Sequence, residues 1–302
     1  MPIETEPFVS IITLNYNQAE VTREFLESSR KLRYKNYEIL VCDMASSIDP
    51  LTQIDPAQYH QTRILHSPKN LGFAGGNNWG MRQATGEFLF IVNNDTEMTP
   101  DLIQKLLEPF QSDSHIAVTC PKIKSFAHPD IIQYAGYRKM NKYTGRTSTI
   151  GENEEDIGQY DSSGPTNGAH GCAMMVKKEI IGKTGMFPEK FFLYYEEWDW
   201  SMRILKAGYS IWYVANTTIL HKESMTVGKE NPLKVYYHSR NRILFMRRNA
   251  DFFHLLIFTL FFTLLSTPKS IFQYMIKGQY KQLTFFLKGI WWNLYSSSSS
   301  VV

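Results

Sequence analysis

The sequence predicts an α/β domain with a mostly parallel central sheet, followed by a helical C-terminal segment. Over the first hundred residues, short apolar runs alternate with helical patterns, as a βαβ sheet requires. Each apolar run ends in polar residues, and the carboxyl ends of parallel strands are where α/β sheets bind ligands. We therefore expect a ligand site at that edge of the sheet.

Four apolar runs are predicted to form buried strands: residues 8–14, 37–42, 62–66 and 87–92. A helix is expected from 18 to 31, and a glycine-rich turn at 71–76 leads into a second helix that ends near Gly86. Residues 121–165 show weak periodicity, which predicts an irregular excursion over the site. Later strands are expected at 172–176, 209–214 and 217–221. A helix through Lys206 precedes the last two, and Gly208 suits its C-terminal cap.

The charge is distributed unevenly along the 302 residues, although the net charge is only +3. Residues 240–302 carry eight Arg and Lys against Asp251 alone, which gives +7 and leaves −4 for residues 1–239. Thirteen of the last 51 residues are aromatic. We therefore divide the chain into an acidic body, 1–239, and a basic, aromatic helical tail, 240–302.

The tail contains two apolar stretches that suit a membrane surface. Residues 252–265 hold 11 Phe, Leu or Ile in 14 positions, which is shorter than the roughly 20 residues of a spanning helix. A second stretch, 283–295, contains Trp291 and Trp292 and has lysines at its edges. Interfacial or re-entrant helices fit this pattern, and the lack of acidic residues after Asp251 favours an anionic membrane. The alternative is that these helices pack on the body or form a dimer interface.

Length and composition exclude several classes of protein. The chain is too long for a disulfide-stapled mini-protein, and an acidic body argues against nucleic-acid binding, which needs a basic surface. The three cysteines are far apart and lack metal or redox spacing, so we expect them to be reduced in a cytosolic core. The start of the chain lacks a basic region followed by an apolar stretch. We therefore expect no secretory signal.

Polar residues at the ends of the first two strands form the first candidate site. Asn15 and Asn17 follow the first strand, and Asp43 follows the second. Such groups can hold a nucleotide base and ribose, with the carboxylate accepting from a base N–H or a ribose hydroxyl. The alternative is helix capping and turn formation, which Asn and Asp commonly perform.

A glycine-rich segment at 70–77 is the second candidate. It contains Asn70, Gly72, Gly75 and Asn77, and glycines before a helix let backbone N–H groups approach a phosphate or sugar. The segment matches neither the dinucleotide fingerprint nor the P-loop, and it follows the third strand rather than the first. Both of those sites are therefore excluded.

The end of the fourth strand, Asn93, Asn94 and Asp95, is the third candidate. A very apolar strand that ends in a carboxylate places Asp95 at the rim of the sheet. There it can bind a divalent cation that bridges two phosphates. The alternative is that Asp95 or Thr96 caps a turn before a helix that starts near residue 100.

The fourth candidate is a cluster of carboxylates among aromatic residues, Glu196, Glu197 and Asp199. Desolvation and mutual repulsion raise at least one pKa in such a cluster, which suits a general base. Arg203 follows one helical turn later, and His221, at the end of a later strand, is a third-shell or metal-binding candidate beside carboxylates. The alternative is a surface Glu197–Arg203 salt bridge and a core histidine.

Together these motifs resemble the family 2 inverting glycosyltransferases, closest to their bacterial rhamnosyltransferase-like branch, over about residues 8–248. The matching segments are 9–17, Asp43, 70–77, 92–95, 168–172, 194–200, Arg203 and His221. The resemblance implies a Rossmann-like sheet of the glycosyltransferase A type and a nucleotide-diphosphate sugar donor. It also implies that Asp43 contacts the base and that Asp95 binds Mg²⁺ or Mn²⁺, with His221 as a second ligand candidate.

The resemblance further implies the donor-binding residues and the base. The donor-binding set is Asn15, Asn17, Asp43, Asn70, Gly72, Gly75, Asn77, Asn93, Asn94 and Arg203. The family's Glu-Asp pair reads Glu196-Glu197 here, so Glu197, Glu196 and Asp199 all remain candidates for the base. The implied reaction is one in-line displacement with inversion, in which a carboxylate deprotonates the acceptor hydroxyl and the metal neutralises the leaving diphosphate.

The expected setting is cell-surface polysaccharide synthesis at the cytoplasmic face of the bacterial inner membrane. The acceptor would be a glycan or a polyprenyl-linked sugar, the tail would be peripheral or re-entrant, and a homo-oligomer is the alternative use of the tail. A catalytically silent nucleotide-sugar or glycan-binding module is the alternative function, against which the intact Asp95 and carboxylate cluster argue. A nucleotidyltransferase would carry a basic first loop, and residues 15–18 are not basic.

Overall fold

The computed structural model describes residues 6–222 and 231–299, and its centre is one mixed sheet. The strands are β1 Val9–Asn15, β2 Tyr37–Asp43, β3 Thr62–His66, β4 Phe88–Val92, β5 Thr96–Met98, β6 Ile116–Ser125, β7 Ile132–Tyr134, β8 Gly164–Thr166, β9 Ala173–Lys177 and β10 Ser210–His221. Among the described residues their order is β3-β2-β1-β4-β9-β6-β10-β5, with β7 beside β6 and β8 beside β10.

The expected parallel pairing holds in two parts of the sheet. Strands β3, β2, β1 and β4 pair in parallel, as do β6 and β10. Strand β9 lies between these parts and is antiparallel to both β4 and β6. A parallel connection between β6 and β9 would need a crossover, usually a helix, and the described residues between them contain no helix. The chain therefore returns to the sheet at the end where β6 finishes, and β9 runs antiparallel to β6. The sheet is therefore more antiparallel than the sequence predicts.

The first four strands begin and end within one residue of the predicted runs. The residues of β1, β2 and β4 are almost all buried, whereas those of β3, at the edge of the sheet, are half-buried or exposed. The two strands predicted at 209–214 and 217–221 are one strand, β10, with an irregularity between Val214 and Thr218. Residues 121–165 are also more regular than expected, since β6 continues to Ser125 and β7 and β8 follow.

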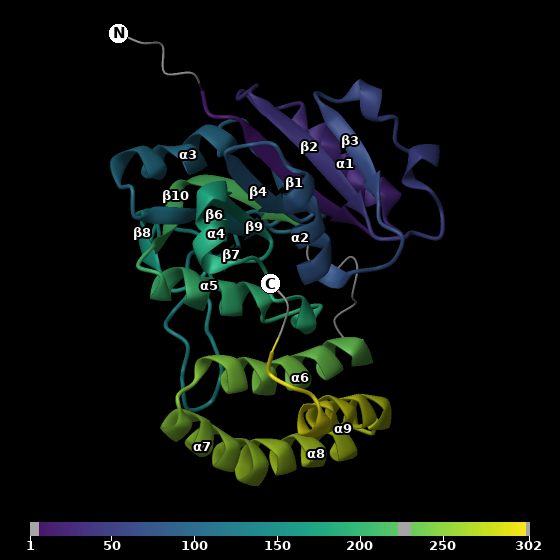
Figure 1. Ribbon diagram of the computed structural model, residues 1–302, viewed down its shortest axis with the longest axis vertical. Helices are drawn as coiled ribbons and strands as arrows, with labels where there is room; N and C mark the ends of the chain where they lie inside the picture. The colour runs from purple at the N-terminus through teal and green to yellow at the C-terminus, as the bar shows by residue number, and fades with distance from the viewer. Residues whose placement is uncertain (1–5, 223–230, 300–302) are drawn as a thin grey trace.

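The helices are α1 Ala19–Ser29, α2 Gly72–Gln83, α3 Leu102–Ser112, α4 Ile181–Thr184, α5 Glu196–Lys206, α6 Pro232–Asn249, α7 Phe252–Phe261, α8 Thr267–Ile276 and α9 Tyr280–Tyr295. Short 3₁₀ turns lie at Pro50–Thr52, Pro56–Gln58, Lys178–Ile180 and Glu189–Phe191. Figure 1 shows the sheet in the upper part of the molecule and α6 to α9 together below it.

The predicted glycine-rich turn is the start of a helix. Gly72 begins α2 with a φ of +69°, and Gly75, Gly76 and Gly80 lie within the helix. A Cβ on Gly80 would lie 2.6 Å from Ile12 Cγ2, and one on Gly76 would lie 2.8 Å from the sulfur of Met44. These two glycines therefore let α2 pack closely against β1 and β2.

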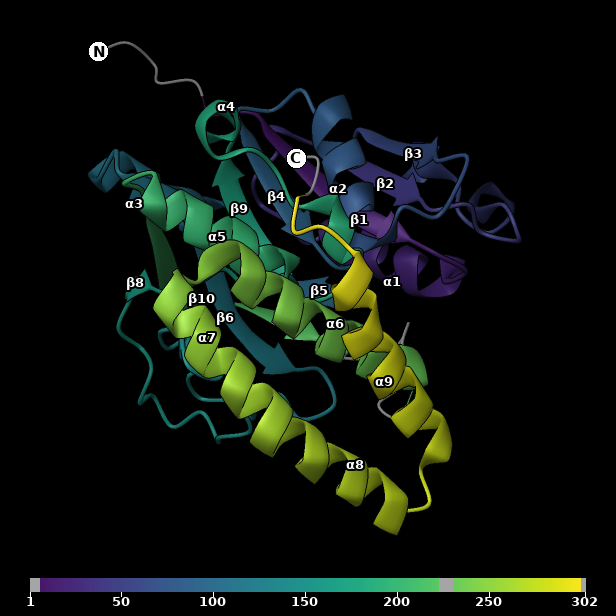
Figure 2. The same ribbon diagram turned by 60° about the horizontal axis from the view of Figure 1, so that its bottom comes forward.

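The apolar helix of the tail is longer than the sequence predicts. Helices α7 and α8 are joined by a π-helical turn, Phe262–Ser266, into one continuous element, which Figure 2 shows beside α9. Pro268 has no N–H for the usual helical bond, and the N–H of Thr267 bonds Phe262 O five residues back. The helix therefore runs from Phe252 to Ile276, which by length and composition is enough to cross a membrane.

Helix α6 connects the sheet to the rest of the tail, and the predicted boundary between residues 239 and 240 falls inside it. Arg240 and Arg242 are buried and donate to backbone carbonyls of the body. Arg247 donates to the end of α9, and Arg248 to Asp199. Half of the positive charge assigned to the tail is thus used in internal contacts.

Candidate active site

A row of polar side chains joins the carboxyl ends of β1, β2 and β4. Asn15 lies opposite Asp43 in the parallel register, and its Nδ2 donates to Asp43 Oδ1 at 2.7 Å. Thr22 from α1 donates to Asn15 Oδ1 at 2.8 Å and accepts from Asn94 Nδ2 at 2.9 Å. The sequence prediction that Asn15, Asp43 and Asn94 share one edge is confirmed, while Thr22, inside a helical pattern, gave no signal.

Asn17 closes the rim of this row. It has a φ of +55°, and its Oδ1 accepts from both the backbone N–H and the hydroxyl of Ser47 at 2.7 Å. The Ser46 hydroxyl donates to Asp43 Oδ1 at 2.5 Å and accepts from Asn15 Nδ2 at 3.2 Å. The row itself is buried, with Asn15 0% and Asp43 3% exposed, and Asn17 at its end is exposed to solvent.

The glycine-rich segment does not present free N–H groups to a ligand. The first amides of α2 are already bonded: Gly72 N–H donates to Asn70 Oδ1 at 2.8 Å, and Phe73 N–H donates to Phe192 O at 2.7 Å. The Asn77 side chain donates back to Phe73 O. The donor-binding assignment of Asn70, Gly72, Gly75 and Asn77 is therefore corrected, because these residues build and pack the helix.

Asp95 and His221 form a pair at the edge of the sheet. Their Oδ1 and Nε2 atoms lie 3.3 Å apart. Gln133 donates through Nε2 to His221 O at 3.4 Å, which leaves its Oε1 to accept from His221 Nδ1 at 2.8 Å. Gln133 therefore holds the imidazole so that its second nitrogen, Nε2, faces the Asp95 carboxylate.

This pair fits a divalent cation. Asp95 Oδ1 is buried and has no hydrogen-bond partner in the described part of the chain, so a carboxylate oxygen and an imidazole nitrogen, both common metal ligands, face each other across 3.3 Å. No group of three or more His, Cys, Asp or Glu suited to a metal occurs among the described residues. A metal held by Asp95 and His221 would therefore take its other ligands from water and the phosphates of a ligand.

Glu196 and Glu197 begin α5, and both carry raised pKa values. Burial, followed by the charge of Glu197, raises the pKa of Glu196 well above its ordinary value. Burial raises the pKa of Glu197 to about 7. One Oε atom of each has no hydrogen-bond partner in the part of the chain that the structure describes. Glu197 therefore titrates where a general base must.

The loop 168–172 connects the glutamates to the turn between β4 and β5 that carries Asp95. A Cβ on Gly171 would lie 4.0 Å from Glu197 Cγ, and Cys172 O accepts from Asn93 N–H at 2.9 Å. His170 of the same loop stacks on Tyr137 at 5.7 Å. Burial, with the nearby charge of His221, lowers the pKa of His170 to about 3, so its imidazole is neutral.

Asp199 and Arg203 lie outside this site. Burial raises the pKa of Asp199, but hydrogen bonds and charge from Arg248, with the charge of Arg203, outweigh it and leave that pKa below its ordinary value. Arg203 donates to Asp199 Oδ1 and to Thr184 O and Met186 O. Asp199 as a base and Arg203 as a donor ligand are therefore corrected to structural roles.

Comparison with known proteins agrees with this geometry. A family model described as Glycosyl transferase family 2 matches residues 10–184, more than half of the chain. A low-salt glycan biosynthesis hexosyltransferase, Agl10 of Haloferax volcanii, is 25% identical over 244 residues, 78% of this chain and 74% of that protein. An N-acetylglucosaminyl-diphospho-decaprenol L-rhamnosyltransferase of Mycobacterium tuberculosis is 22% identical over 260 residues, 78% of this chain and 83% of that protein.

Solved structures show the same fold at low identity. The mannosyltransferase PcManGT of Pyrobaculum calidifontis, in complex with GDP-Man and Mn²⁺, aligns with a TM-score of 0.58 and 14% identity over 98% of this chain and 91% of that one. GalNAc-T7 with UDP, GalNAc and Mn²⁺ aligns with a TM-score of 0.61 and 14% identity over 79% of this chain and 49% of that one. The sheet is therefore of the glycosyltransferase A type.

Proposed function

Because the chain belongs to glycosyl transferase family 2, we propose that it is a metal-dependent, inverting enzyme that transfers a hexosyl or rhamnosyl group from a nucleotide-diphosphate sugar to an acceptor hydroxyl. The observation that carries this proposal is Glu197, a half-buried residue with one buried carboxylate oxygen and a pKa of about 7. It lies against the loop that bonds Asn93, two residues from Asp95. A base and a cation site therefore share one edge of the sheet.

The side chains divide the work of the reaction. Asp43, whose carboxylate is fixed by the buried Asn15, and the exposed Asn17 would contact the nucleoside. Asp95 and His221 would hold Mg²⁺ or Mn²⁺, which would supply positive charge against the leaving diphosphate. Glu197 accepts the proton of the acceptor hydroxyl. The oxygen electron pair then forms the new bond at the anomeric carbon as the bond to the diphosphate oxygen breaks on the opposite side, which inverts the configuration.

Glu197 is the better base of the adjacent pair. Two buried carboxylates close together do not both ionise readily, and the pKa of Glu196 is raised further than that of Glu197. Glu196 therefore favours its protonated form more strongly than Glu197, which makes Glu197 the member of the pair that ionises and can accept a proton. Asp199 is ionised but is bound by two arginines, which makes it a weak proton acceptor.

We place the tail on the cytoplasmic face of a bacterial inner membrane, where a glycan or polyprenyl-linked acceptor would be found. Leu256, Leu260 and Leu264 repeat every four residues along the long helix and are 47% to 68% exposed. Only 17% of the most apolar window of that helix is buried, so it is not a core helix. A relative is named for a diphospho-decaprenol substrate, which is consistent with this location.

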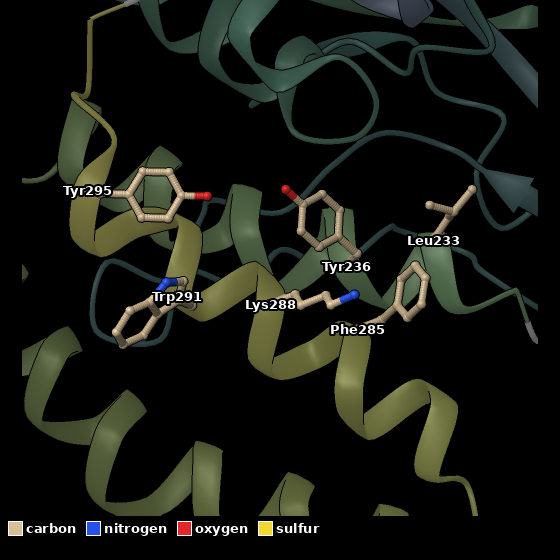
Figure 3. A pocket seen from close by; sticks show the side chains of 6 residues that line it. All are labelled: Leu233, Tyr236, Phe285, Lys288, Trp291 and Tyr295. Atoms are coloured by element: carbon tan, nitrogen blue, oxygen red, sulfur yellow. The ribbon is translucent and has the colours of Figure 1, made fainter.

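Helices α6 and α9 add aromatic residues that also suit a membrane surface. An open groove of about 340 Å³ lies between α6 and α9, and Figure 3 shows its lining. The lining residues are Leu233, Tyr236, Phe285, Lys288, Trp291 and Tyr295. Trp and Tyr favour the interface between water and lipid, and lysine favours anionic headgroups.

The reaction is tested with the purified full-length protein, a panel of nucleotide-diphosphate sugars and polyprenyl-linked acceptors. We expect release of nucleoside diphosphate with one donor and loss of release with chelator, with Asp95→Ala and with Glu197→Gln. Asp130→Ala, at an exposed carboxylate elsewhere, is the control. Binding of a donor without turnover on any acceptor would instead indicate a silent binding module. The anomeric configuration of the product decides inversion.

Membrane attachment is tested by flotation with vesicles that contain phosphatidylglycerol. We expect the wild-type protein to float and the triple variant Leu256→Gln, Leu260→Gln, Leu264→Gln to remain soluble. Leu51→Gln, at an exposed leucine of the body, is the control. A protein that does not float but forms a dimer that the triple variant disrupts would show that a second copy covers this face.

A further inference from the structure

We infer that Asn241 of helix α6 is a positioning residue for the general base, because it holds the backbone turn that leads into Glu197. This inference rests on the function proposed above. Asn241 is fully buried, and its Nδ2 lies 3.0 Å from Phe191 O, 2.7 Å from Leu193 O and 2.8 Å from Tyr194 O. The two hydrogens of one amide thus serve three carbonyls of the segment just before the glutamates, with one hydrogen shared between two of them.

The turn at 191–195 needs such support. Phe192, Tyr194 and Tyr195 have φ values of +64°, +70° and +75°, which bulky side chains rarely adopt. Sparsely populated backbone conformations persist only where the surroundings over-determine them. Three such residues directly precede α5, so the direction in which Glu196 and Glu197 leave the turn depends on contacts from outside it.

Contacts reach the turn from two separate helices. Phe192 O accepts from Phe73 N–H of α2 at 2.7 Å. Arg240 of α6 donates to Lys190 O and Phe191 O, and its Nε donates to Asn241 Oδ1 at 2.8 Å. That last bond leaves the Nδ2 donors of Asn241 directed at the carbonyls.

An asparagine suits this position for a chemical reason. Three backbone carbonyls of the turn face this position of α6, and the Arg240 guanidinium already bonds one of them, Phe191 O. An uncharged side chain with two N–H hydrogens can serve the others without a second buried charge. A residue without donors would leave those carbonyls unsatisfied in a buried place. The unsatisfied carbonyls would then rotate toward water, and this change in the turn would shift the first residues of α5.

The same contacts connect the tail to the reaction. The Arg240 guanidinium lies 4.6 Å from the ring of Trp292 in α9, and Asn293 of α9 donates to Arg240 O at 2.9 Å. The helices that we place at the membrane are therefore bonded to the residues that hold the base. Helix α6 belongs to the active site as well as to the tail.

The test compares Asn241→Leu, which keeps the approximate volume but has no donor, with Asn293→Ala. Asn293 is also a buried asparagine between α6 and α9, but its Nδ2 bonds Arg240 O and Gly289 O and does not reach the turn. Asn241→Ala is the second variant if the leucine variant does not fold. Each is measured for kcat, for donor KM, for the pH dependence of kcat and for amide hydrogen exchange at residues 192–199.

Asn241→Leu is expected to lower kcat by about 100-fold, since a misplaced catalytic group has an effect of this size. Donor KM should change by less than about two-fold, because Asn15, Asp43 and Asp95 lie on other elements. The acid limb of the kcat profile should move to lower pH as Glu197 reaches water. The titratable groups that interact with Glu197 are Glu196, Tyr137, Tyr194 and Tyr195, and Arg240 acts on Glu196. All of them are retained in both variants.

Faster exchange confined to residues 192–199 in Asn241→Leu, and absent in Asn293→Ala, would support the inference. An unchanged acid limb, or an equal loss of kcat in Asn293→Ala, would overturn it. The hydrogen-exchange arm does not depend on turnover. If the wild-type protein transfers no sugar, the proposed function fails, and exchange alone still decides whether Asn241 holds the turn.

Discussion

Replacing Glu197 with glutamine should remove the activity and stabilise the protein at alkaline pH. The ordinary pKa of a glutamate, 4.5, is raised by burial to about 7 at this position. A carboxyl group with a raised pKa binds its proton more tightly in the folded state than in the unfolded state. Its contribution to stability is therefore complete below pH 4.5 and is lost as the pH rises through 7.

The size of the effect follows from these two values. One pKa unit corresponds to 1.36 kcal/mol, so full ionisation of Glu197 removes at most about 3 kcal/mol of folding free energy. The partial exposure of Glu197 and its pairing with Glu196 reduce that figure. Glutamine carries no charge at any pH, so Glu197→Gln should exceed the wild type by up to about 3 kcal/mol at pH 8 and by little at pH 4.5. Loss of the base should lower kcat by about 10² to 10⁴-fold.

Urea unfolding at pH 8 and pH 4.5 measures the stability difference, and donor turnover at pH 8 measures kcat. Glu179→Gln, at an exposed glutamate, is the control and should change neither quantity. In the wild type, kcat should fall about ten-fold from pH 8 to pH 6 as Glu197 takes up its proton. A Glu197→Gln variant that is no more stable at pH 8 than at pH 4.5, relative to wild type, would refute the reasoning.

Three further substitutions test other parts of the structure. Gln133→Ala should weaken Mn²⁺ binding by about 10 to 100-fold, because the imidazole of the metal pair loses its orienting partner; calorimetry with a nucleoside diphosphate present measures this, and unchanged affinity contradicts it. Gly289→Ala should lower the free energy of unfolding by about 1–3 kcal/mol, since the added Cβ would lie 2.7 Å from a carbonyl of α6, whereas Gly182→Ala, with open space around it, should be neutral. Asp199→Asn should lower the stability by about 3–5 kcal/mol by leaving Arg248 without its ion pair; because the pKa of Asp199 is lowered, the difference from wild type should shrink as urea unfolding is repeated at pH values that fall below 3.8.

The strands of the N-terminal half could be predicted closely because their burial leaves a continuous apolar signal. β1, β2 and β4 are buried along nearly their whole length, and turn residues bound them on both sides. The direction of β9 could not be predicted, because it depends on where the preceding excursion returns and not on its own residues. The tail helix continues past Pro268 because of a π-helical turn. No local sequence pattern predicts such a turn, so the full length of the helix could not be predicted.

The site residues that lie at the ends of strands could be predicted from the sequence. Asp95 and His221 are at the ends of paired regions of the sheet, and the adjacency of β5 and β10 brings them together. The glycines of α2 gave a misleading signal, because phosphate binding and close packing against a sheet both require residues without a Cβ. Asn241 gave no site signal, since its role depends on a turn about 50 residues earlier in the chain.

Half of the basic residues of the tail make contacts within the protein and are not available to a membrane, and this affects how membrane attachment should respond to salt. Arg240, Arg242, Arg247 and Arg248 bond groups within the protein, so only four exposed lysines remain to attract anionic lipid. Each contributes about 1 kcal/mol at low salt.

Full burial of one leucine or phenylalanine contributes about 1.5–3 kcal/mol, and the long helix exposes nine large apolar side chains, from Phe252 to Ile276. Apolar contact should therefore dominate membrane attachment. Flotation with phosphatidylglycerol vesicles should weaken but persist in 1 M NaCl, where charges are screened over about 3 Å. Complete release by salt would show instead that the lysines hold the protein and that the apolar face has another partner.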